Sequence, residues 1–131
     1  MIVVDNSVLV SINYDGGVVG EAAAKRLLGA GDWYVPALID VEFVSATRGL
    51  LRGGKITKEL AEEAVRELPL LPMHRVPHEG LLPRMWELRD NFSAYDAAYV
   101  ALAEQLDATL LTSDVRMYRG TGKRCAVELI G

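Results

Sequence analysis

Short apolar segments alternate with segments of helical periodicity along the whole chain, and this alternation constrains the fold more than any other feature. The expected strands are Ile2–Val4, Trp33–Val35, Met73–Val76, Thr109–Leu111 and Ala126–Ile130. The expected helices cover residues 19–28, 37–51, 58–68, 79–89 and 93–106. Strands that alternate with helices favour a central parallel sheet flanked by helices on both faces. We therefore predict an α/β fold with one domain over residues 1–131, a length that leaves little room for a second core.

Several boundary residues support these elements. Thr57 and Ser93 are suited to cap the helices that follow them, because a hydroxyl can accept a hydrogen bond from a free backbone amide. Pro83 lies inside the segment 79–89, so that helix should begin late or have a kinked first turn. The polar residues after Val4 are interpreted as a loop that leaves the first strand.

Composition excludes several classes of protein. Half of the residues are hydrophobic and 24% are charged, which is typical of a folded domain and not of a disordered chain. No run of about 18 apolar residues is present, so we expect no membrane span. The first residues lack the positive region of a signal peptide. A single cysteine, Cys125, cannot form an internal disulfide, and together these features predict a cytoplasmic protein.

The formal net charge of −4 is unusual for a protein that binds nucleic acid. If four of the 18 acids form a metal site, however, the remaining surface carries 14 positive and 14 negative charges. Basic residues also cluster in two stretches, which are either solvated faces or contacts for an anionic partner. These residues are Arg48, Arg52, Lys55 and Lys58, and then Arg116, Arg119, Lys123 and Arg124.

Two acids follow predicted strands. Asp5 comes directly after the first strand, and Asp114 comes shortly after the segment Thr109–Leu111. Parallel strands present their carboxyl ends at one edge of the sheet, where α/β proteins bind ligands, so both carboxylates should reach that edge. Either acid alone also fits an Asx turn or a helix cap.

Glu42 lies in the predicted helix 37–51 among apolar and small residues. Helical spacing places it on one stripe with Leu38, Val41, Ser45, Ala46 and Gly49. Small residues would let this stripe approach the sheet closely, and a carboxylate there is costly unless something pairs with it. The alternative is a surface acid at the edge of the stripe. Asp40 projects away from the stripe and is expected to be solvated.

Asp96 occupies the third helical position after Ser93, which is the pattern of a capping box. A first-turn acid also lies at the helix end where an ion could bind. Four converging acids would repel one another, and a divalent cation would relieve that repulsion. All-oxygen ligation suits Mg²⁺ or Mn²⁺ better than zinc, and no His or Cys cluster competes. His74 and His78 are isolated, and we assign them no role.

Four motifs in this order resemble a PIN domain of the kind found in VapC toxins of bacterial and archaeal toxin–antitoxin pairs. They are Met-Ile-Val-Val-Asp5-Asn-Ser7, Glu42 in a helix after a proline, Ser93-Ala-Tyr-Asp96-Ala-Ala-Tyr-Val-Ala-Leu-Ala, and Leu-Leu-Thr112-Ser-Asp114. Any one motif is weak, but the four in order cover essentially the whole chain and are fairly specific.

The resemblance implies a ribonuclease in which Asp5, Glu42, Asp96 and Asp114 bind Mg²⁺ or Mn²⁺. A metal-activated water would then hydrolyse an RNA phosphodiester. Ser7 and Thr112 match hydroxyl positions that support such a site, although each also fits a turn hydroxyl at a strand end. Many relatives have a further polar or acidic residue after the last Asp. Val115-Arg116-Met117 follows here, so a second metal position would be weak or absent.

The resemblance also implies a VapB-like antitoxin that blocks the cleft, and a homodimer. Leu50, Leu51, Leu68 and Leu70 are candidates for exposed apolar contacts with such a partner. A phosphatase of the haloacid-dehalogenase type also begins with an Asp after its first strand, but it needs a second Asp where this chain has Ser7. A non-catalytic RNA-binding or assembly module on a PIN-like fold stays open as an alternative.

Overall fold

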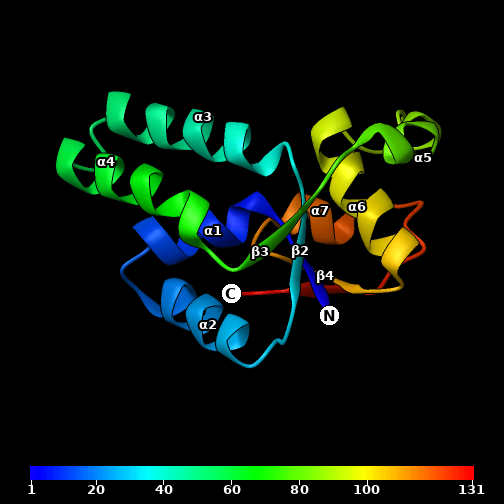
Figure 1. Ribbon diagram of the computed structural model, residues 1–131, viewed down its shortest axis with the longest axis horizontal. Helices are drawn as coiled ribbons and strands as arrows, with labels where there is room; N and C mark the ends of the chain where they lie inside the picture. Colours follow the sequence, from blue (N-terminus) through cyan, green and yellow to red (C-terminus); the bar gives the residue numbers. More distant parts are fainter.

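The computed structural model describes all 131 residues, and its centre is a five-stranded parallel sheet (Figure 1). The strands are β1 (Ile2–Val4), β2 (Trp33–Pro36), β3 (Met73–Val76), β4 (Thr109–Thr112) and β5 (Val127–Leu129). Their order across the sheet is β3-β2-β1-β4-β5, and every neighbouring pair is parallel. The predicted α/β class with a central parallel sheet is thus confirmed.

Seven helices surround the sheet: α1 (Asn6–Tyr14), α2 (Val18–Leu28), α3 (Ile39–Arg52), α4 (Lys58–Glu67), α5 (Leu82–Glu87), α6 (Ala94–Leu106) and α7 (Val115–Arg119). Two 3₁₀ turns, η1 (Leu68–Leu70) and η2 (Glu79–Leu81), precede β3 and α5. In Figure 1, α1 to α4 gather on one side of the strands, and α5 and α6 lie on the other. None of the helices has the length and hydrophobicity that a membrane crossing needs.

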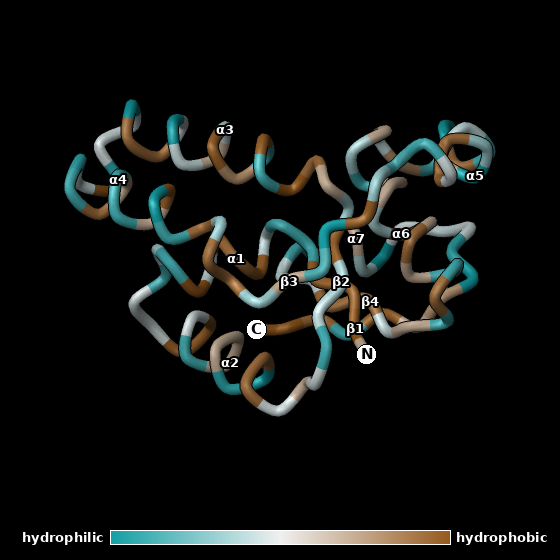
Figure 2. Tube along the Cα trace, in the orientation of Figure 1, coloured by the Kyte–Doolittle hydropathy of each residue, from teal (hydrophilic) through white to brown (hydrophobic).

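The core is continuous across the sheet and both helical layers. β1 and the centre of β4 are fully buried, which explains why they appear in the sequence as unbroken apolar runs. In α6, every residue from Ala97 to Ala103 is buried, because this helix packs on β1, β2 and β4. Figure 2 shows the same pattern, with hydrophobic segments along the central strands and hydrophilic turns on the outer side of the helices.

Two helices were missed by the sequence analysis. Residues after Val4 form α1 and not the expected loop, and α1 buries Val8, Leu9 and Ser11. The five-residue helix α7 is too short to show helical periodicity. The expected caps are confirmed, since the hydroxyls of Thr57 and Ser93 accept hydrogen bonds from amides three residues later. The segment around Pro83 begins as η2, so its α-helix starts late, as expected.

The orientation of α3 differs from the prediction. Its buried residues are Ile39, Phe43 and Thr47, whereas Val41, Ser45 and Gly49 of the predicted stripe are exposed. Phe43 stacks on Tyr14 of α1 with ring centroids 5.8 Å apart, so the face with the larger apolar area turns inward. The stripe that carries Glu42 therefore does not pack on the sheet.

Two further expectations need correction. Asp40 is not simply solvated, because Arg75 binds both of its carboxylate oxygens, at 2.7 and 3.0 Å. Leu68 is 4% exposed and packs in the core, so it cannot serve as an exposed contact. Leu51 and Leu70 are exposed, as expected, and Leu50 is partly buried.

The close approach of α1 and α2 can be tested at Gly20. A Cβ there would collide with the carbonyl oxygen of Asp15, so Gly20→Ala should lower the free energy of unfolding by about 1–3 kcal/mol. Gly49→Ala is the matched control, because no atom lies within 4 Å of its Cβ position. Alanine at position 49 should stabilise α3 by about 0.5–1 kcal/mol. Urea unfolding of both variants measures this, and an unchanged Gly20→Ala protein would contradict the packing.

Candidate metal centre

Asp5 is the buried acid around which the site is built. It lies directly after β1, is 5% exposed, and occupies the position that caps α1. Its amide donates to the carbonyl oxygen of Leu111 at 2.9 Å, which joins the end of β1 to β4. The carboxylate is thus held at the carboxyl edge of the two central strands.

Two hydroxyls bind the same oxygen of Asp5. Ser7 donates to Oδ2 at 2.6 Å, and Thr112 donates to Oδ2 at 2.8 Å. The other oxygen, Oδ1, receives no hydrogen bond from the protein. Because Ser7 lies in the first turn of α1 and Thr112 ends β4, the two bonds hold the carboxylate from two elements and leave one oxygen available.

The same hydroxyls hold the loop that follows β4. The amide of Ser113 donates to Ser7 Oγ at 2.9 Å, and the amide of Asp114 donates to Thr112 Oγ1 at 3.0 Å. Asp114 in turn caps α7, since its Oδ1 accepts from the amide of Arg116 at 2.9 Å. Asp114 therefore has the helix-cap role that was considered as its alternative. Its other oxygen, Oδ2, lies 3.5 Å from the guanidinium of Arg116, whose side chain is 92% exposed.

Glu42 is oriented by a buried tyrosine. The hydroxyl of Tyr99 on α6 donates to Glu42 Oε1 at 2.6 Å. Tyr99 is completely buried, and burial raises its pKa well above the ordinary value, so the hydroxyl keeps its proton and acts as a donor. This bond connects α3 with α6 across the edge of the sheet and fixes one oxygen of Glu42.

Asp96 lies in the first turn of α6. Its amide donates to Ser93 Oγ at 3.1 Å, so the capping serine anchors this residue. Its carboxylate forms no hydrogen bond or ion pair within the protein and is half-buried. The four candidate acids thus come from four separate segments: the end of β1, α3, the start of α6 and the loop after β4.

Burial and mutual repulsion raise the pKa values of three of these acids. Burial raises the pKa of Asp5 to about 6, with smaller contributions from Asp96 and Asp114. Burial also raises the pKa of Glu42 to about 7, assisted by Asp5 and Asp96 and opposed by the bond from Tyr99. The pKa of Asp96 is raised by burial and by Asp114. Each acid therefore lies within electrostatic reach of at least two others.

The donor set fits a hard divalent cation. Asp5, Glu42 and Asp96 have no Lys or Arg partner, and oxygen is the only ligand type at the site. No three acidic, His or Cys side chains stand at the spacing of an assembled metal centre. This arrangement suits an ion that is bound through one or two carboxylates and keeps several waters, as Mg²⁺ does.

Sequence reasoning missed two residues of the site. Tyr99 was interpreted as part of an apolar run, although its spacing of three residues from Asp96 places both on one side of α6. Asn6, next to Asp5, has a buried Oδ1 without a hydrogen-bond partner. His74 stacks on Tyr34 with centroids 4.7 Å apart, and His78 lines the same cavity as Glu42, described below.

The two basic clusters differ in their surroundings. Arg48, Arg52, Lys55 and Lys58 are all exposed on α3, α4 and the turn between them. In the second cluster, the ammonium of Lys123 donates to the carbonyl oxygens of Met117, Tyr118 and Gly120 after α7. This lysine therefore stabilises the end of α7, whereas the side chains of the first cluster are exposed at the surface and both interpretations of that cluster stay open.

Comparisons with known proteins agree with this geometry. The sequence profile of the PIN domain matches residues 2–123. The chain is 35% identical over 130 residues to Ribonuclease VapC9 of Mycobacterium tuberculosis, covering 99% of this chain and 98% of VapC9. It is 41% identical over 96 residues to Ribonuclease VapC1 of the same organism, covering 72% of each chain.

Two solved structures share the fold. FitAcB from Neisseria gonorrhoeae superposes with a TM-score of 0.72 at 23% identity and covers 97% of this chain and 96% of its own. VapC20 from Mycobacterium tuberculosis, described as a Sarcin-Ricin loop cleaving toxin, superposes with a TM-score of 0.70 at 16% identity. That alignment covers 90% of this chain and 93% of VapC20.

The raised pKa values predict that the metal-free protein loses stability as pH rises. The folded pKa values of Asp5 and Glu42, about 6 and 7, exceed their ordinary values of 3.8 and 4.5. The folded state therefore holds more protons in this range, and the stability present below about pH 4 is lost as pH rises through about 6 and 7. For Asp5 alone the loss is roughly 2–3 kcal/mol.

Thermal unfolding in chelator from pH 4 to pH 8 measures this effect. Asp5→Asn and Glu42→Gln should each flatten the pH dependence, because each removes one titrating group. A wild-type protein whose unfolding temperature is constant or rises between pH 5 and pH 8 would contradict the predicted direction.

Proposed function

The chain belongs to the PIN-domain family, and we propose that it is a metal-dependent endoribonuclease of the VapC type, the toxin of a toxin–antitoxin pair. Similarity over 99% of the chain to a VapC ribonuclease supports the nuclease assignment. The observation that carries the metal dependence is the Asp5 carboxylate. It is buried, and one of its oxygens accepts no hydrogen bond. Three other acids interact with it electrostatically, and no basic side chain forms an ion pair with it.

In this proposal the acidic set of Asp5, Glu42, Asp96 and Asp114 would hold the cation, Mg²⁺ or Mn²⁺, with one or two of the carboxylates in direct contact and the others acting through bound waters. Such an ion would offset the negative charge of the phosphodiester and promote ionisation of the attacking water. The hydroxyls of Ser7 and Thr112 keep Asp5 in place through its Oδ2, so that Oδ1 would be the oxygen left to hold the ion. These hydroxyls are positioning groups and take no part in the chemistry themselves.

Glu42 is the best placed proton acceptor among the four. Burial raises its pKa to about 7 in the metal-free protein, which shows that this carboxylate holds a proton more readily than an ordinary glutamate. Tyr99 holds Oε1 at 2.6 Å, which leaves Oε2 to orient a water or accept its proton.

The partners follow from the same proposal. The substrate is RNA, and the regulator is a VapB-like antitoxin. A homodimer and a cytoplasmic location, both expected from the sequence, are part of the proposal as well.

Asp5→Asn tests the catalytic role directly. Asparagine has nearly the same size, but its amide oxygen is a poor ligand for a hard cation. Cleavage of a mixed-sequence RNA with Mg²⁺ or Mn²⁺ should fall by at least about a hundredfold, while the thermal stability of the metal-free protein stays equal or rises slightly as repulsion among the acids is relieved.

Asp40→Asn is the control, since Asp40 pairs with Arg75 and lies outside the acidic group. It should cost stability and leave cleavage nearly unchanged. Full cleavage by the Asp5→Asn protein, or equal cleavage by wild type in chelator, would reject the metal-nuclease proposal and favour the non-catalytic RNA-binding module.

The antitoxin should cover the exposed apolar surface of α3 and η1 and bring a cation to the acids. Val44 and Leu70 are 46% and 80% exposed on this side. Val44→Lys should therefore weaken the complex with the antitoxin by about tenfold or more, whereas Val18→Lys, at an 83% exposed position on α2, should not. When the antitoxin's Arg and Lys residues are replaced one at a time, one replacement should weaken binding to the wild type but not to the Asp5→Asn protein. A complex that is indifferent to all these changes would contradict the proposed contact.

A further inference from the structure

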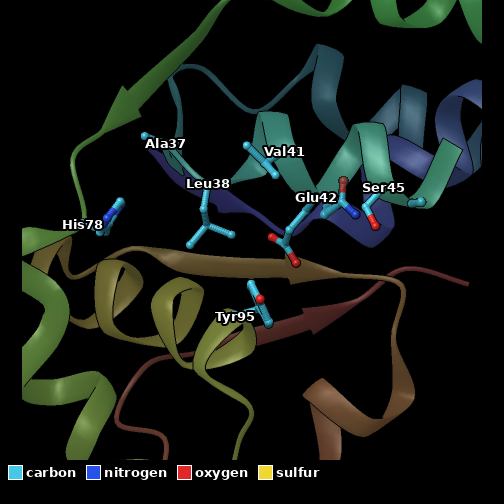
Figure 3. A pocket seen from close by; sticks show the side chains of 9 residues that line it. Ala37, Leu38, Val41, Glu42, Ser45, His78 and Tyr95 are labelled. Atoms are coloured by element: carbon cyan, nitrogen blue, oxygen red, sulfur yellow. The ribbon is translucent and has the colours of Figure 1, made fainter. Parts of the chain in front are cut away.

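A cavity of about 750 Å³ opens beside Glu42, between α3, the segment after β3 and the start of α6 (Figure 3). Its volume falls within the range of about 300–1,000 Å³ that is usual for small-molecule sites. Glu42 and Ser45 line the cavity from α3, and Leu38 lines it from the N-terminal cap of that helix. Tyr95 lines it from α6, and His78 stands at one end (Figure 3).

The walls of this cavity are largely apolar and are not covered by any part of the chain. Val41 is 74% exposed and Tyr95 is 63% exposed, although both line a concave surface. In Figure 3, Leu38 and Glu42 point from α3 toward Tyr95. This is the stripe that the sequence placed against the sheet, and the burial of Phe43 on the opposite face of α3 is what leaves it open.

The cavity is continuous with the acidic site. Glu42 belongs to both, Tyr95 directly precedes Asp96, and Asn6 directly follows Asp5. A phosphodiester held at the acids would therefore place one of its attached nucleosides at the cavity. A cation at the acids would offset the charge of the scissile phosphate only, so affinity for the attached nucleoside has to come from its base.

Its polar groups are suited to the edge of a base. Asn6 lines the cavity, and a side-chain amide can both donate to and accept from the edge of a base. The imidazole of His78 can donate or accept. A flat aromatic ring beside a few hydrogen-bonding groups is the usual arrangement by which proteins bind unstacked bases of single-stranded RNA.

We propose that this cavity binds the base of the nucleotide next to the scissile phosphate, with Tyr95 stacking on the base and Asn6 and His78 contacting its edge. The proposal rests on the nuclease function above and deepens it, because it assigns a nucleotide preference to named residues. It also restricts the substrate to RNA whose base is unpaired at that position.

Tyr95→Ala, Tyr95→Phe and Trp86→Ala separate the base contact from other roles. Tyr95→Phe keeps the ring, and Trp86 is an exposed aromatic residue, 68% accessible, outside the cavity. A single-stranded RNA pool of random sequence is cleaved with Mg²⁺ or Mn²⁺, KM and kcat are measured, and the ends of the products are sequenced. Tyr95→Ala should raise KM by about fivefold or more and flatten the base preference beside the cleavage site. Tyr95→Phe and Trp86→Ala should keep the preference of the wild type.

The outcomes distinguish failure of this proposal from failure of the nuclease assignment. If the wild type cleaves in a metal-dependent manner and Tyr95→Ala has an unchanged KM and preference, the base site is rejected and the nuclease stands. If Tyr95→Ala weakens only the complex with the antitoxin, the cavity is a protein-binding groove and the base site is likewise rejected. If the wild type cleaves no RNA, both proposals fail.

Discussion

The carboxylate of Asp5 is buried where β1 meets β4, and the rest of the site is arranged around it. Its Oδ2 accepts two hydrogen bonds, whereas its Oδ1 accepts none. One oxygen accepts bonds from Ser7 and Thr112, which also hold the amides of Ser113 and Asp114. A buried carboxylate is costly to a fold unless its charge is compensated, and hydrogen bonds to one oxygen compensate it only in part. The remaining cost appears as a pKa of about 6. The structure thus keeps an incompletely compensated carboxyl group at the junction of its two central strands.

The other acids increase this cost. Glu42 and Asp96 both have raised pKa values, caused first by burial and then by neighbouring acids. Elsewhere the chain pairs its acids with arginine, as in the bidentate contacts of Asp40 with Arg75 and of Glu104 with Arg84. Asp40 and Glu104 thus stabilise the fold through ion pairs, whereas Glu42 and Asp96 have no arginine in contact at the edge of the sheet. Uncompensated charge of one sign in a cleft is the electrostatic arrangement expected of a functional site.

The sequence predicted the strands, the parallel sheet and the four acids, because each of these depends on local pattern and on the rule that parallel strands end at one edge. It did not predict α1, because the polar residues Asp5, Asn6 and Ser7 at its start were interpreted as a loop. It also placed the wrong face of α3 against the sheet. That orientation depends on the stacking of Phe43 on Tyr14, a contact between residues 29 positions apart that no local pattern encodes. Tyr99 escaped notice for a similar reason, since its partner Glu42 lies 57 positions away. The cavity beside the acids is a direct consequence of these non-local contacts.

Anomalous diffraction from crystals of the protein grown with Mn²⁺ tests whether the acidic edge is a cation site. We expect an anomalous peak in contact with Asp5 Oδ1 and with a carboxylate oxygen of Asp96 or Asp114, and its loss in Asp5→Asn crystals. A structure in which Mn²⁺ is absent from this edge at saturating concentration, or binds in the Asp5→Asn protein as it does in the wild type, would contradict it.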